Sequence, residues 1–202
     1  MPDLNFCPEC ASPLLPHRVD NQERKHRYCP RCREPRHDFP MVVVTSFVAC
    51  GEKLLWVQRN LEPQRGKWAI PGGFLENGET LAEGAARELY EEAGVDIAPT
   101  ELQLYMMGTI TFINQVYVGF RATVDSEFCS GGVESMDCRF YALHECPWDE
   151  VAYPQVNDSI LQAYSDLETG SFDIWQAEMT SSQYDLRPVS QQKNGTGSTP
   201  EP

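Results

Sequence analysis

The pattern of apolar and polar positions along the chain predicts several β-strands. Residues 41–49 form an almost unbroken run of β-branched and other apolar side chains, typical of a strand buried on both faces. A turn at 51–52 separates it from a second predicted strand over 53–59. Within 115–124 every second residue is apolar, as in a half-buried strand, and a further short strand is expected over 139–143.

Two segments have the spacing of amphipathic helices. Thr80 followed by Glu83 is a capping box, so we expect a helix from Thr80 to Ala93. Its predicted buried stripe has apolar residues at steps of four: Leu81, Ala85, Leu89 and Ala93. A second helix is expected over 154–168, with the apolar stripe Val156, Ile160, Ala163, Tyr164 and Leu167. A mixed sheet with helices packed against it predicts an α/β sandwich.

Composition narrows the class of protein. The chain is 41% hydrophobic and 23% charged, which indicates a globular protein and excludes a mostly disordered one. No apolar run approaches the roughly 20 residues of a membrane-spanning helix. The first ten residues lack the basic and apolar regions of a signal peptide, so we expect a cytoplasmic protein. The polar end predicts a C-terminal extension over 171–202, largely disordered from about residue 181.

Four of the eight cysteines form two pairs. Cys7 and Cys10, and Cys29 and Cys32, are each separated by two residues, and 18 residues lie between the pairs. Two such loops facing each other provide four thiolates in a tetrahedron, the ligand set of structural Zn²⁺. Disulfides are disfavoured without an export signal, and a redox motif is disfavoured without a βαβ setting. We therefore expect a small zinc ribbon over residues 1–38, folded by its metal.

The net charge of −14 disfavours unspecific binding to nucleic acid or anionic lipid. It is uneven, because residues 1–40 carry a net +1 and residues 41–202 a net −15. The predicted ribbon contains a basic loop: His17, Arg18, Arg24, Lys25, His26 and Arg27. This loop is either a contact for a phosphate-bearing or nucleic-acid partner or a solvated surface, and we favour the solvated surface.

Some of the acidic residues form a pattern on the first predicted helix. Glu88, Glu91 and Glu92 stand at i, i+3 and i+4, so their carboxylates share one helix face and repel one another without a cation. Hard oxygen ligands of this kind suit Mg²⁺ or Mn²⁺, which bridge to substrate phosphates. Gly72 and Gly73 permit a tight loop just before the helix. The alternative is a solvated acidic helix face.

The spacing around these glutamates carries a family resemblance. Gly73 is followed by five residues, Glu79, seven residues and then RELYEEAGV, which begins at Arg87. This resembles the Nudix box, GX5EX7REUXEEXGU with U aliphatic, at every specified position. The resemblance implies a Nudix α/β/α sandwich with a mixed sheet, over 39–170, after the zinc ribbon. It also implies hydrolysis of a nucleoside diphosphate linked to another moiety.

The resemblance implies roles for individual residues. Glu88, Glu91 and Glu92 would hold Mg²⁺ or Mn²⁺ together with the carbonyl of Gly73. Arg87 and Glu79 would form an orienting ion pair. The general base would be Glu92, Glu91 or a glutamate outside the box. The outside candidate is Glu134, on a glycine-rich loop over 130–135, with Asp137 as its neighbouring alternative.

Two softer stretches, 62–68 and 145–154, look like the zinc-ribbon Nudix subfamily that includes ADP-ribose and FAD pyrophosphatases. This likeness implies cleavage of ADP-ribose or FAD to AMP plus a second phosphate product. The related NADH diphosphatases carry an SQPWPFPxS segment after the box, which is absent here. Hydrolysis of NADH or nucleotide-capped RNA is therefore the alternative. A non-catalytic nucleotide sensor is a further alternative, although every box carboxylate is present.

Substrate contacts are the least specific part of the sequence. Arg65, before the Gly-Gly turn, is a candidate diphosphate contact, although it also fits an ordinary surface arginine. Trp68 and Phe74 are candidate binding residues for the nucleotide. The full set of aromatic side chains on which an adenine could stack is Trp56, Trp68, Phe74, Tyr105, Phe112 and Tyr117. The resemblance leaves a homodimer open, because many Nudix enzymes dimerise.

Overall fold

The computed structural model describes residues 5–18, 25–37 and 39–191. Its chain divides into two compact units, Met1–Pro40 and Met41–Pro202. Within the described residues, no helix combines the length and the apolar character that crossing a bilayer would require.

The N-terminal unit is built on a three-stranded antiparallel sheet. Its strands are β1 (Leu15–Arg18), β2 (Lys25–Cys29) and β3 (Glu34–Arg36), in the order β1-β2-β3. Among the described residues of this unit, the buried cluster consists of Leu14, Cys7 and Cys29. Because so little apolar surface is buried, this unit depends on something other than a hydrophobic core.

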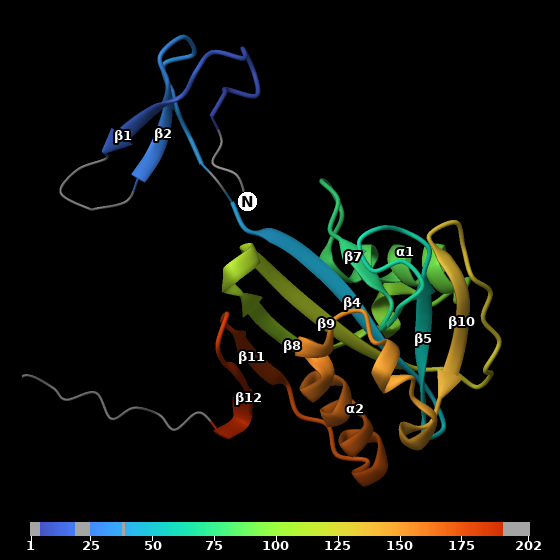
Figure 1. Ribbon diagram of the computed structural model, residues 1–202. Helices are drawn as coiled ribbons and strands as arrows, with labels where there is room; N and C mark the ends of the chain where they lie inside the picture. The colour runs from blue at the N-terminus through green and yellow to red at the C-terminus, as the bar shows by residue number, and fades with distance from the viewer. Residues whose placement is uncertain (1–4, 19–24, 38, 192–202) are drawn as a thin grey trace, which may run out of the picture. The chain divides into compact units, whose positions relative to one another are not determined.

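The C-terminal unit contains a nine-stranded mixed sheet in the order β10-β5-β4-β9-β8-β11-β12 (Figure 1). The strands, in chain order, are β4 (Met41–Cys50), β5 (Lys53–Arg59), β6 (Trp68–Ala69), β7 (Gly72–Phe74), β8 (Gln103–Ile110), β9 (Gln115–Thr123), β10 (Ser135–Tyr141), β11 (Trp175–Met179) and β12 (Tyr184–Pro188). The pairs β4–β9 and β8–β11 are parallel and the other pairs of this order are antiparallel. The two shortest strands lie off this order, β6 beside β5 and β7 beside β4.

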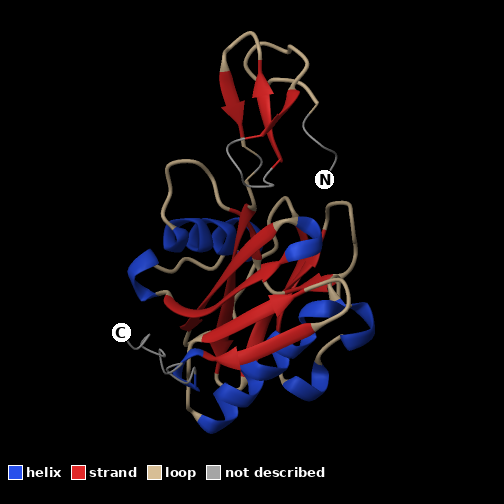
Figure 2. Cartoon of the chain, turned by 90° about the vertical axis from the view of Figure 1, so that its left-hand side faces the viewer, coloured by secondary structure: helices blue, strands red, loops and turns tan. Residues whose placement is uncertain are grey.

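Two helices cover opposite faces of this sheet (Figure 2). On β4, Val44 and Val48 pack in one apolar cluster with α1 (Leu81–Ala93), while Phe47 packs in a second cluster with α2 (Asn157–Thr169). This alternation arises because successive strand residues point to opposite faces. Short 3₁₀ turns complete the unit: η1 (Pro99–Glu101), η2 (Thr111–Ile113), η3 (Leu143–Glu145), η4 (Trp148–Glu150), η5 (Pro154–Val156) and η6 (Val189–Gln191). The predicted α/β/α sandwich with a mixed sheet is confirmed.

The helix boundaries follow from capping. The N–H of Glu83 donates to the hydroxyl of Thr80 (3.3 Å), and the N–H of Thr80 donates to the carboxylate of Glu83 (2.7 Å), so α1 starts at Leu81. Leu81 itself is 39% exposed, so the predicted buried stripe was wrong at its first member. The second helix begins after η5, three residues later than predicted.

The C-terminal segment differs most from the prediction. Strand β11 pairs with β8, and β12 pairs with β11, so the expectation of disorder from about residue 181 was wrong through Gln191. Ala177 and Met179 are buried, and Tyr184 packs against the core on the α2 face. The polar composition hid a period-two pattern whose apolar residues complete the sheet. Residues 192–202 lie outside the described residues.

Candidate active site and metal centres

The acidic site begins where β7 lies against the helix. Gly73 pairs with Val44 of β4, and a Cβ at Gly73 would lie 2.5 Å from the carboxylate of Glu88. Only glycine lets the backbone approach that carboxylate so closely. Next to it, the N–H of Gly72 donates to Oε2 of Glu92 (2.8 Å). The Gly-Gly turn therefore contacts two acidic residues of α1 with its backbone.

The three glutamates of α1 occupy different environments. Glu88 and Glu92 are 9% and 7% exposed, whereas Glu91 is exposed. Burial raises the pKa of Glu92 to about 7, although the Gly72 hydrogen bond favours its ionised form. Burial also raises the pKa of Glu88, and the neighbouring charges of Glu91 and Glu134 contribute. Removing carboxylates from water while they repel one another produces a site that favours a proton or a cation.

Arg87 connects the loop to the helix. Its Nε and Nη2 donate to the two carboxylate oxygens of Glu79 (3.0 and 2.8 Å), a bidentate ion pair. Its Nη1 donates to Glu88 (2.8 Å) and Glu91 (3.1 Å), and Nη2 also donates to the carbonyl of Phe74 (3.1 Å). Hydrogen bonds from Arg87 lower the pKa of Glu79 to about 2. The contact between Arg87 and Glu79 that the resemblance implies is present in the structure.

Glu134 comes from a distant part of the chain. It lies in the loop between β9 and β10, and its negative charge raises the pKa of both Glu88 and Glu92. Its side chain is exposed, and none of the hydrogen bonds among the described residues involves its carboxylate. Asp137, the alternative, forms an ion pair with Arg139 (2.7 Å) on β10. The N–H of Gly132, in the same loop, donates to the carbonyl of Glu92 (3.3 Å), so the loop that bears Glu134 lies against the end of α1, beside the acidic site.

The donor atoms of these residues are of the type that binds a divalent cation, although they do not surround a single point. The donors are carboxylates and a backbone carbonyl, the hard oxygens that Mg²⁺ and Mn²⁺ prefer. Among the described residues, the four cysteines are the group whose metal-donor atoms all lie within 4.8 Å, and the carboxylates of α1 do not form such a group. Arg87 holds Glu88 and Glu91, and the turn holds Glu92. Such an open site suits Mg²⁺, which keeps several waters.

The four cysteines of the N-terminal unit form a closed site. Sγ of Cys7 lies 3.9 Å from Sγ of Cys32, and Sγ of Cys10 lies 3.5 Å from Sγ of Cys29. A Zn²⁺ with Zn–S bonds of about 2.3 Å places its sulfurs about 3.8 Å apart, so the spacing fits zinc. Disulfides would bring paired sulfurs to about 2.05 Å, and all four cysteines are free.

Both cysteine loops have the same backbone. The N–H of Ala11 donates to the carbonyl of Cys7, and the N–H of Arg33 donates to the carbonyl of Cys29, each at 2.8 Å. Ala11 and Arg33 both have positive φ, at 55° and 60°. The hydroxyl and backbone of Ser12 lower the pKa of Cys10 to about 6, which favours the thiolate that binds metal. Of the basic loop expected between these turns, Arg27 lies on β2 and is half-buried, and the backbone or side chains of the other residues are outside the described part of the chain.

The proposed substrate contacts divide by burial. Trp68 is 6% exposed on β6 and packs edge-on against Tyr141, with ring centroids 5.3 Å apart, which contradicts a role in base stacking. Phe74 on β7 is 52% exposed and remains a candidate. Arg65 is exposed in the loop between β5 and β6 and also stays a prediction. Of the other aromatic candidates, Phe112 is exposed, and the buried ones are Trp56, Tyr105 and Tyr117.

Sequence reasoning missed Arg59 at the end of β5. Its guanidinium lies over the ring of Tyr153, 5.5 Å from the centroid, and its Nε donates to the carbonyl of Pro63 (3.3 Å). Its charge lowers the pKa of Glu92, so it faces the acidic site. No carboxylate of the described residues forms an ion pair with it. The sequence feature that could have identified Arg59 is its position, because it is a basic residue at the end of a buried strand.

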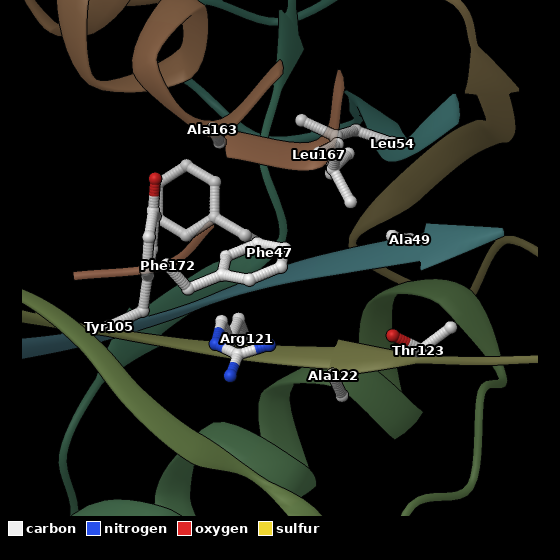
Figure 3. Close-up of a pocket in the computed structure, with 10 residues that line it drawn as sticks. All are labelled: Phe47, Ala49, Leu54, Tyr105, Arg121, Ala122, Thr123, Ala163, Leu167 and Phe172. Atoms are coloured by element: carbon white, nitrogen blue, oxygen red, sulfur yellow. The ribbon is translucent and has the colours of Figure 1, made fainter. Parts of the chain in front are cut away.

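A small cavity lies on the other face of the sheet, beside α2 (Figure 3). Its volume is about 10 Å³, which is room for one water molecule. Its wall includes Phe47, Tyr105 and Leu167, and the guanidinium of Arg121 lies 4.0 Å from the centroid of the Phe172 ring. None of the acidic site residues lines it. We interpret it as a packing gap.

A family model described as the NUDIX domain matches residues 40–163. The chain belongs to the NUDIX family. A crystal structure of a NUDIX hydrolase from Nitrosomonas europaea superposes with a TM-score of 0.80 and 29% sequence identity, covering 88% of this chain and 99% of that one. This agreement extends over most of the chain.

Two curated relatives are named for different substrates. The chain is 26% identical over 147 residues to an NAD-capped RNA hydrolase, NudC, of Vibrio parahaemolyticus, covering 71% of this chain and 53% of that protein. It is 41% identical over 56 residues to an ADP-ribose pyrophosphatase of Methanocaldococcus jannaschii, covering 28% of this chain and 33% of that protein. The chain thus spans about half of the first relative and a third of the second.

Proposed function

We propose that this protein is a Mg²⁺- or Mn²⁺-dependent NUDIX pyrophosphohydrolase that cleaves an ADP-ribose- or FAD-type nucleoside diphosphate to AMP plus a second phosphate product. The observation that carries the proposal is the meeting of Glu88 and Glu92 with Glu134, next to the backbone of Gly72-Gly73. Family membership provides the reaction class, and these residues provide a place for it.

The residues have distinct tasks in this reaction. Glu88, Glu91 and Glu92, with the Gly73 carbonyl, would hold the cation, which supplies charge neutralisation at the diphosphate and a more acidic water. Arg87 orients the carboxylates and, with Glu79, fixes the loop against the helix. Glu134 takes the proton of the attacking water, because its carboxylate is exposed and makes no hydrogen bond among the described residues.

Arg59 supports binding of a diphosphate. It is a cation beside the acidic site without a carboxylate partner among the described residues, and it stacks on Tyr153. A diphosphate brings negative charge to carboxylates that otherwise repel it, so a positive side chain at the rim offsets that repulsion. Arg65 and Phe74 remain the proposed contacts to the rest of the substrate.

We also propose Zn²⁺ in the four-cysteine site, where it holds the ribbon together. A small-molecule nucleotide is the partner we expect, in a cytoplasmic setting. The similarity to NudC over 71% of this chain favours a second candidate, hydrolysis of NADH or of NAD-capped RNA. Against it stands the absence of the SQPWPFPxS segment after the box.

A panel of substrates separates these candidates. The protein would be assayed with Mg²⁺ against ADP-ribose, FAD, NADH and NAD-capped RNA, with AMP or capped-end release as the readout. Preferred turnover of ADP-ribose or FAD is the expected result. Preferred turnover of NADH or capped RNA would replace it by the second candidate. Turnover of none of them by zinc-loaded protein would contradict the proposal.

A further inference from the structure

The position of Glu134 depends on backbone contacts rather than on its own side chain. We propose that Asn60 is a positioning residue that holds Glu134 at the acidic site, with Gly132 as a second anchor of the same loop. This inference rests on the proposed function, in which Glu134 accepts the proton of the attacking water.

Asn60 binds two consecutive carbonyls of the loop. Its backbone N–H donates to the carbonyl of Glu134 (2.8 Å), and its side-chain Nδ2 donates to the carbonyl of Val133 (3.0 Å). The side chain of Val133 is 88% exposed, so no apolar burial holds this part of the loop. Asn60 directly follows Arg59, the last residue of β5, which gives it a rigid support. The hydrogen bonds of Asn60 therefore hold the loop at Val133 and Glu134, next to Ser135, which begins β10 and pairs with Arg59.

Gly132 attaches the same loop to the catalytic helix. Its N–H donates to the carbonyl of Glu92 (3.3 Å), and the N–H of Ser130 donates to the carbonyl of Ala93 (2.8 Å). These carbonyls belong to the last turn of α1, which lacks partners inside the helix. A Cβ at Gly132 would lie 1.7 Å from the carbonyl oxygen of Glu91, so any other residue would displace the loop. The helix that carries the metal-ligand candidates thus also locates Glu134.

The hydrogen bonds of Asn60 and of Gly132 thus hold the same short loop, and the side chain of Glu134 in that loop makes no hydrogen bond among the described residues. A base that is displaced by about 1 Å loses much of its efficiency, because proton transfer needs hydrogen-bond geometry. The side chain of Asn60 acts through the carbonyl of Val133, whereas the backbone N–H keeps its bond to Glu134 when the side chain is replaced. Removal of the side chain should therefore affect turnover rather than substrate affinity.

The test is a double-mutant cycle between Asn60→Ala and Glu134→Gln. Asn60→Ala should lower kcat by about tenfold or more with KM within about twofold, and amide hydrogen exchange over 130–134 should become faster. The double variant should be no slower than Glu134→Gln alone, because both substitutions remove the same contribution to kcat, that of the Glu134 carboxylate. Gly132→Ala should reproduce the loss of kcat. Asn60→Ser, whose hydroxyl is too short to reach Val133, repeats the test if Asn60→Ala folds poorly.

Lys53→Ala is the matched control. Lys53 lies at the start of β5 and forms an ion pair with Glu127 (2.9 Å) at the other end of the same loop, so its loss should leave kcat unchanged. An unchanged kcat in Asn60→Ala, additive effects with Glu134→Gln, or an equal loss in Lys53→Ala would each overturn the inference. Failure of the proposed function looks different, since the wild-type protein would then hydrolyse none of the substrates, and the inference would fall with it.

Discussion

The two candidate metal centres of this protein are built in opposite ways. The four sulfurs of the ribbon already meet within 4.8 Å, in a unit whose buried cluster is Leu14 with two cysteines. The carboxylates of the NUDIX site are more open, and they stand on a helix that packs against the sheet through Ala85, Leu89 and Ala93. In the ribbon a metal would supply the folding energy, whereas the NUDIX domain has a hydrophobic core of its own and a metal there would serve the reaction.

The largest expected effect is in the ribbon. Cys7→Ser removes one thiolate, so the N-terminal unit should lose its zinc and its ordered structure, because structural Zn²⁺ contributes roughly 10 kcal/mol or more. Metal analysis and amide hydrogen exchange over 5–37 would show this. Turnover by the NUDIX domain should survive if the ribbon is only a separate folding unit. Ser substitution at Cys50, outside the cluster, is the control and should keep the zinc.

A second effect should appear in catalysis without loss of fold. Glu92→Gln keeps the shape of the side chain but removes its charge, so kcat should fall by about a thousandfold while the melting temperature does not fall. Glu168→Gln, an exposed acid on α2, is the matched control and should retain full activity. Full activity in Glu92→Gln would show that the site has been assigned wrongly.

The burial of Glu92 should also be visible in the pH dependence of stability. The pKa of Glu92 is about 7 in the folded protein, above its ordinary value of 4.5, so folding favours the protonated form. Without added Mg²⁺, the contribution of Glu92 to the free energy of unfolding should be largest below about pH 4.5. It should decline as the pH rises to about 7, by about 3 kcal/mol.

Denaturant unfolding across this range would measure the decline. Glu92→Gln should abolish it, and millimolar Mg²⁺ should reduce it, because the cation stabilises the ionised carboxylate. A wild-type curve that rises between pH 4.5 and 7 in the absence of Mg²⁺, with the same rise in Glu92→Gln, would contradict the assigned burial.

The smallest effect tests the scaffold alone. Thr80→Ala removes the hydroxyl that caps α1, which should destabilise the NUDIX domain by about 1 kcal/mol with kcat close to wild type. Thr169→Ala, near the end of α2, is a control that leaves the catalytic helix untouched. A large loss of kcat in Thr80→Ala would contradict this expectation, because it would mean that the acidic site depends on the capped start of the helix.

Predictions from local spacing agreed best with the structure. The capping box at Thr80, the i, i+3, i+4 glutamates and the two cysteine pairs depend on residues close in sequence, and backbone periodicity alone brings such residues together. The contact between Arg87 and Glu79 follows in the same way, since only seven residues lie between them.

Predictions that needed distant contacts fared worse. Trp68 stands near the Gly-Gly turn in sequence, yet packing against Tyr141 buries it. Strands β11 and β12 were missed because a polar segment of five residues becomes a strand only when an edge such as β8 is available to pair with it.

The sequence by itself determined the family motif, the donor residues of both candidate metal centres and the helix that carries three of the acids. Only the tertiary structure decided which of those acids is buried, which loop brings Glu134 to them, and that Asn60 and Gly132 hold that loop. The reason is physical: short-range spacing is encoded in the geometry of a helix or turn. Long-range proximity instead results from the packing of the whole sheet, which no single segment specifies.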